Sequence, residues 1–201
     1  INAGVAVTVT GTAICNSLTT ASGATYSPIT IVGTNTLTVI NTTTLNNASG
    51  TGSDTFAVGA GTLISGSISL TNAGGGQAAR KAVMTVSTGT INCTGIFSFV
   101  GTNNELTFSG AGTLNIGGNL GAGGTLTTVA GSVVNFNGSS AQTAGDYTYT
   151  VLKVNNTAST TLAGAATITT LTIGDATSAS VFSDGGYVIT PGAGRKSPRR
   201  C

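Results

Sequence analysis

Few side chains in this sequence could do acid–base, nucleophilic or metal chemistry. Its 201 residues include no histidine, three cysteines and five acids. Without an imidazole, no Ser-His-Asp or Cys-His arrangement and no histidine-ligated metal site can form. Glycoside hydrolysis needs two carboxylates that face each other across a sugar. The acids are spread along the chain, and only Asp175 and Asp184 lie within ten positions of each other.

Asp146, Asp175 and Asp184 each stand next to a glycine or another turn former. Aspartate in such a position usually hydrogen-bonds its own backbone in a turn. We therefore expect no catalytic residue, no metal site and no cofactor, and we interpret the chain as non-enzymatic.

The three cysteines are Cys15, Cys93 and Cys201, and none has the spacing of a metal-binding or redox pair. Cys15 with Cys93 is a possible disulfide, which would leave Cys201 free or paired between chains. Sequence spacing alone does not fix this connectivity.

Composition predicts a secreted chain. Charged residues make up only 6% of the sequence, and no apolar stretch approaches the roughly 20 residues that span a bilayer. Because the sequence begins at Ile1 rather than at methionine, we expect a processed chain that is extracellular or on the cell surface.

The charges are unevenly distributed. Residues 1–194 carry three bases against five acids, a net of −2, so this part has no basic face for nucleic acid. Four cations lie in the last seven residues: Arg195, Lys196, Arg199 and Arg200. We expect one elongated domain over residues 1–194, followed by a basic tail over 195–201.

The sequence predicts that the secondary structure consists of short β-strands. Apolar runs or alternations of three to eight residues recur between Gly, Asn and Ser. They include residues 5–9, 37–40, 68–70, 83–86, 96–100, 106–108, 114–116, 126–129, 133–136, 147–154, 171–173 and 187–189.

Repetition favours a particular arrangement of these strands. The segments 59–63 and 110–114 both read Gly-Ala-Gly-Thr-Leu, and 123–126 is a degenerate copy. Short strands with Gly-rich corners and inward aliphatics suit a parallel β-solenoid, in which each coil is buried only against its neighbours. The alternative is a β-sandwich with strand exchange between subunits.

Residues 110–120, 131–143 and 149–156 resemble the repeats of large bacterial cell-surface and autotransporter-like adhesins. The resemblance covers about residues 105–190. It implies secretion, a β-helical stalk and a role in adhesion or extracellular matrix, with no catalytic residues to transfer.

Weak protection of the strand edges predicts assembly. Soluble proteins usually block exposed edges with Lys or Pro, and this chain has few of either. Val5, Val7 and Val9 form one apolar row, so the segment that ends at Ile14 is a candidate donor strand or cap. The alternative is that it forms the first coil. We also expect the basic tail to contact a neighbouring subunit.

These expectations lead to a structural subunit of an extracellular filament or cell-surface layer, whose partner is another copy of itself. The alternative function is an adhesin stalk fragment that weakly binds surface glycans.

Overall fold

The structure is a computed structural model of the whole chain. It describes residues 1–2, 4–20, 27–47, 52–72, 80–175 and 179–192. The described residues form strands, turns and irregular segments, with no helix among them.

The strands form three sheets, and every strand pair is parallel. A six-stranded sheet contains, in spatial order, β1 (Val7–Val9), β4 (Ile29–Ile31), β6 (Ser53–Val58), β8 (Lys81–Val86), β11 (Glu105–Phe108) and β13 (Thr125–Thr127). A three-stranded sheet contains β15 (Gln142–Ala144), β17 (Ser159–Leu162) and β19 (Val181–Ser183).

The largest sheet has eleven strands. Its main path is β2 (Ala13–Cys15), β5 (Thr36–Asn47), β7 (Thr62–Asn72), β9 (Thr90–Cys93), β12 (Thr113–Ile116), β14 (Val133–Phe136), β16 (Thr148–Val154), β18 (Ala166–Ile173) and β20 (Ile189–Pro191). Two further strands pair off this path: β3 (Leu18–Thr19) with β5, and β10 (Phe97–Val100) with β7.

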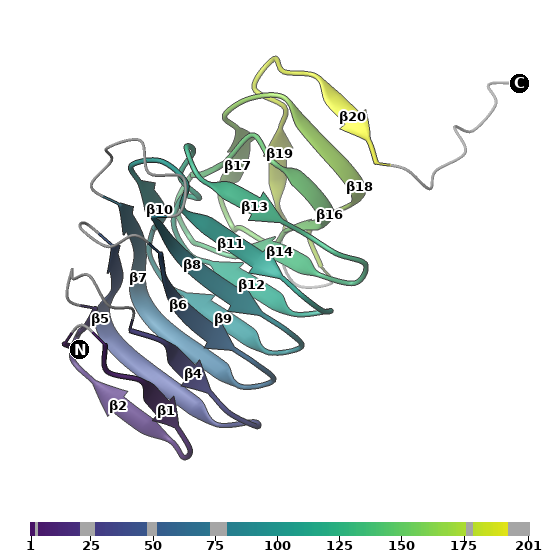
Figure 1. Cartoon of the computed structure of the whole chain (residues 1–201). Helices are drawn as coiled ribbons and strands as arrows, with labels where there is room; N and C mark the ends of the chain where they lie inside the picture. The colour runs from purple at the N-terminus through teal and green to yellow at the C-terminus, as the bar shows by residue number, and fades with distance from the viewer. Residues whose placement is uncertain (3, 21–26, 48–51, 73–79, 176–178, 193–201) are drawn as a thin grey trace, which may run out of the picture.

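The chain winds through these sheets as a parallel β-solenoid, and its coils stack from the N-terminal end to the C-terminal end (Figure 1). Registered partners show the length of a coil: Leu63 pairs with Ile91, 28 positions later, and Val134 pairs with Leu152, 18 positions later. The solenoid prediction is confirmed. The sandwich alternative is wrong, because Greek-key sandwiches are built from antiparallel pairs.

Aliphatic columns run through the interior of the solenoid. Strand side chains alternate between buried and partly exposed positions, and the buried ones stack on their registered partners. One such column contains Leu37, Leu63, Ile91, Leu114, Val134 and Leu152. All six are at most 6% exposed, so each coil is held mainly by the apolar side chains of its two neighbours.

Candidate assembly surfaces

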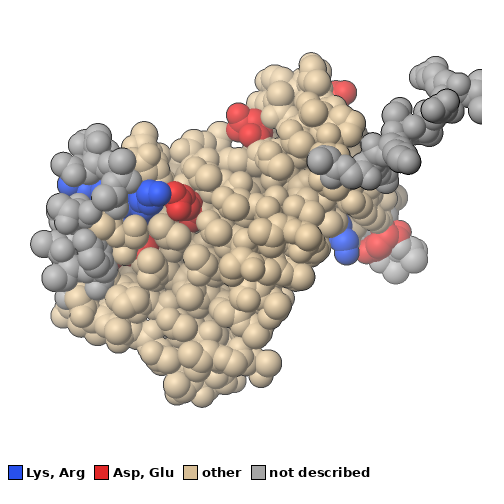
Figure 2. Space-filling model, turned by 45° about the vertical axis from the view of Figure 1, so that its right-hand side comes forward, with Lys and Arg blue, Asp and Glu red and all other residues tan. Residues whose placement is uncertain are grey.

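The described charges are few and scattered over the surface (Figure 2). Lys81 and Glu105 form an ion pair with a 2.5 Å Nζ–Oε1 distance, and both side chains are partly exposed. No group of three or more His, Cys, Asp or Glu that could hold a metal ion occurs among the described residues. The described surface therefore offers hydroxyls, amides and apolar side chains rather than a cluster of titratable groups.

Among the described charged residues, only Asp54 is buried, with an exposed fraction of 3%. Its carboxylate accepts hydrogen bonds from the Ser27 backbone N–H at 3.0 Å and from the Thr20 hydroxyl at 3.3 Å. Burial raises the pKa of Asp54 and outweighs the two hydrogen bonds, which lower it. These bonds connect three segments of the N-terminal coils, so we assign Asp54 a structural role.

Replacing Asp54 with asparagine should stabilise the protein at neutral pH. A carboxyl with a raised folded-state pKa favours folding below its unfolded pKa, and this contribution is lost as pH rises through the folded pKa. Asparagine keeps the shape and an oxygen for Ser27 but carries no charge. Thermal midpoints of the wild type and Asp54→Asn should differ most at pH 7 and converge near pH 3. A constant difference between the two pH values would contradict the assignment.

The two described cysteines are both free thiols, so the possible disulfide between Cys15 and Cys93 is not formed. The register explains why. Cys15 pairs with Val39, Val39 with Ser65, and Ser65 with Cys93, which places the cysteines in one column but three strand spacings apart. Three spacings amount to about 14 Å, whereas bridged cysteines need Cα atoms closer than about 7 Å.

Cys93 is buried, and its thiol donates weak hydrogen bonds to the carbonyls of Gly95 and Ile96. Burial raises its pKa to about 12, so it remains a protonated, unreactive thiol at neutral pH. Cys15 is only partly buried, because it lies in the first coil.

A hollow lies at the N-terminal end of the described solenoid. It has a volume of about 370 Å³, and its lining includes Val7, Ala13, Cys15 and Leu18. These four side chains pack against the core from one side and remain partly exposed. In the interior, the same positions are covered by the next coil. The hollow therefore has the chemistry of a core surface that lacks one layer.

The residues predicted to form an assembly strand differ in which way their side chains point. Val7 and Val9 face the interior, whereas Val5 is 46% exposed and Ile14 is 70% exposed. The strand that contains Val7 and Val9 is β1, which pairs with β4 of the same chain. This segment therefore contributes to the first coil, as in the alternative interpretation.

Sequence reasoning missed the inward residues next to Ile14. Side-chain alternation places Ala13 and Cys15 on the face opposite Ile14, toward the hollow. The signal was present in the alternation, but Ala-Ile-Cys is too short to show which of its two faces is buried.

The C-terminal end also exposes apolar side chains. Leu171, Phe182 and Ile189 pack against the core and remain partly buried. Val181, Tyr187 and Val188 are 57%, 46% and 70% exposed. Figure 1 places β19 and β20 in the last coils of the stack, so this surface lies at the opposite end from the hollow.

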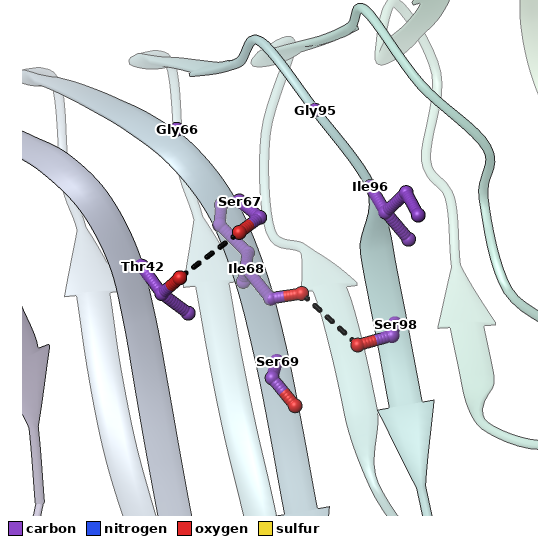
Figure 3. Close-up of a pocket in the computed structure, with 8 residues that line it drawn as sticks. All are labelled: Thr42, Gly66, Ser67, Ile68, Ser69, Gly95, Ile96 and Ser98. Atoms are coloured by element: carbon purple, nitrogen blue, oxygen red, sulfur yellow. Dashed lines mark hydrogen bonds between the residues drawn. The ribbon is translucent and has the colours of Figure 1, made fainter.

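A groove of about 530 Å³ lies on the outer surface where β5 and β7 bend (Figure 3). Its polar groups include Thr42, Ser67 and Ser98, which already form hydrogen bonds within the protein. The Thr42 and Ser67 hydroxyls are 3.1 Å apart, and the Ser98 hydroxyl donates to the Ile68 carbonyl at 3.3 Å. None of the residues that line this groove is aromatic or charged. It therefore lacks the stacking surface that sugar-binding sites commonly use.

The remaining predicted assembly residues, Arg195, Lys196, Arg199 and Arg200, lie outside the described residues, as does Cys201. Within the described part of the chain, no helix is long and apolar enough to cross a membrane. No protein-family model, curated protein or solved structure matches this chain.

Proposed function

We propose that this chain is a non-enzymatic structural subunit of an extracellular filament or cell-surface layer, in which copies stack end to end by β-strand pairing. The observation that carries the proposal is that both ends of the solenoid leave core-facing apolar side chains partly uncovered. Covering such surface is favourable by about 25 cal/mol per Å².

Strand direction supports the same arrangement. All described strand pairs are parallel, so a second copy placed in the same orientation continues the stack. The C-terminal coils of one copy then lie on the N-terminal coil of the next, and apolar side chains such as Phe182 and Ile189 approach the hollow around Ala13. A head-to-tail contact of this kind does not close on itself, so it produces a filament.

The test compares two substitutions by negative-stain electron microscopy and sedimentation over a concentration series. Ala13→Asp puts a charge into the hollow, whereas Ile40→Asp puts the same charge on an exposed side chain that does not line it. We expect Ala13→Asp to raise the concentration needed for assembly by at least about tenfold, a change of about 1.4 kcal/mol. Ile40→Asp should assemble like the wild type.

Circular dichroism and the thermal midpoint of dilute samples confirm that both variants fold. Uniform filaments of the wild type with an axial repeat of one subunit would support the proposal. Wild-type monomers at every concentration would contradict it and favour the adhesin stalk, for which a glycan-binding screen is the next measurement.

A further inference from the structure

The outer edge of β20 is the surface that the next copy must pair with at the C-terminal end. Hydrogen bonds fix which of its residues face inward along the sheet. The Ala166 N–H donates to the Val188 carbonyl at 3.2 Å, and the Gly192 N–H donates to the Ile168 carbonyl at 3.1 Å. In a parallel ladder, alternate residues bond to opposite neighbours. Residues 188, 190 and 192 therefore bond to β18.

The two residues between them, Ile189 and Pro191, direct their backbone groups to the free edge. Thr190 is registered with Thr167 of β18, which is consistent with this alternation. Proline has no backbone N–H and so cannot donate to an added strand. Pro191 thus removes one of the two donors that β20 would offer to a neighbour, at a position where its own pairing with β18 loses nothing.

The strand at the opposite edge of the same eleven-stranded sheet is β2. Its residues are Ala13, Ile14 and Cys15, so it contains no proline and keeps every backbone N–H. The two edges of this sheet therefore differ in their protection against strand addition.

We propose that Pro191 limits the addition of β2 of a second copy, the opposite edge of the same sheet, to β20, and so sets the concentration at which copies stack. This inference rests on the proposed end-to-end assembly and names the contact that controls it. Proline at the edge of a sheet is an established means of discouraging strand addition. Because Pro191 is exposed, its replacement leaves the core unchanged.

The experiment measures the assembly threshold of Pro191→Ala by light scattering and sedimentation. Restoring one donor adds one hydrogen bond per contact, so we expect the threshold to fall about two- to tenfold. Thr190→Ala is the matched control, because it leaves the edge donors of the same strand unchanged.

The outcomes separate the two proposals. A lower threshold for Pro191→Ala, with Thr190→Ala at the wild-type value, supports both. Assembly of Pro191→Ala when the wild type stays monomeric supports the role of Pro191 and overturns filament formation by the native chain. Equal thresholds for the wild type and Pro191→Ala overturn the role of Pro191 and leave the filament standing. If neither protein assembles, both proposals are overturned.

Discussion

Replacing Gly89 with alanine should destabilise the solenoid by about 3 kcal/mol or more, because the corners of successive coils contact each other through backbone atoms. A Cβ atom on Gly89 would lie 2.6 Å from the Val58 carbonyl oxygen, 2.9 Å from that of Gly59 and closer still to that of Gly61. All three are backbone atoms, which no rotamer change can move away. Relief would require separation of two coils.

Gly11→Ala is the matched control for this change. A Cβ atom there meets nothing within 4 Å, so the substitution should change the free energy of unfolding by less than about 1 kcal/mol. Urea unfolding followed by circular dichroism gives both values. Similar stabilities for the two variants would show that the coils are not packed this closely at their corners.

The Gly-rich sequence predicted that such corners exist, but it did not predict which residues contact each other there. Gly59-Ala60-Gly61-Thr62-Leu63 and its second copy were recognisable as a turn and the strand that follows it, and β7 begins at Thr62. Which glycine contacts which coil depends on the register between coils. Because registered partners lie from 18 to 29 positions apart, no fixed period in the sequence reveals that register.

The fold class was predictable because the main apolar runs are short and alternate, as in residues 83–86 and 106–108, which lie in β8 and β11. Two of the strands that the sequence analysis missed are rich in hydroxyl and amide groups. β15 (Gln142–Ala144) and β17 (Ser159–Leu162) place Gln142 and Thr160 in the interior. Residue type alone would place both side chains in solvent.

Gln142 shows why its interior position could not be inferred. Its amide donates to the Ile116 carbonyl at 2.9 Å and accepts hydrogen bonds from the Gly138 backbone N–H and from the Asn156 amide. These partners lie 4 to 26 positions away in sequence. A buried polar side chain is tolerated only where such partners exist, and they exist only once the coils are stacked.

The proposed assembly surface was also only partly predictable from the sequence. The apolar row of Val5, Val7 and Val9 was visible in the sequence, and two of its three members do face the core. The pairing of this row with β4 was not visible in the sequence, because a strand of the first coil and a donated strand show the same alternation. The exposure of Ala13 to the hollow follows from its place in the first coil of the stack, which the sequence does not show.

Loss of the Asn104 side chain should strongly destabilise the interior, because it is fully buried and joins three backbone segments. Its amide nitrogen donates to the Leu70 and Val100 carbonyls, both at 2.9 Å, and its oxygen accepts from the Ala82 N–H at 3.2 Å. Alanine at position 104 would remove these partners and leave the Leu70 carbonyl and the Ala82 N–H buried without them. We expect a loss of about 3–5 kcal/mol in the free energy of unfolding.

Asn35→Ala is the control for that substitution. The Asn35 amide donates to the nearby Val32 carbonyl at 2.6 Å in an exposed turn, where water can replace it. Its loss should cost about 1 kcal/mol or less. Urea unfolding measures both variants. A small effect for Asn104→Ala would mean that water enters the corner between the coils and satisfies the three groups. The buried amide would then not be what holds this corner closed.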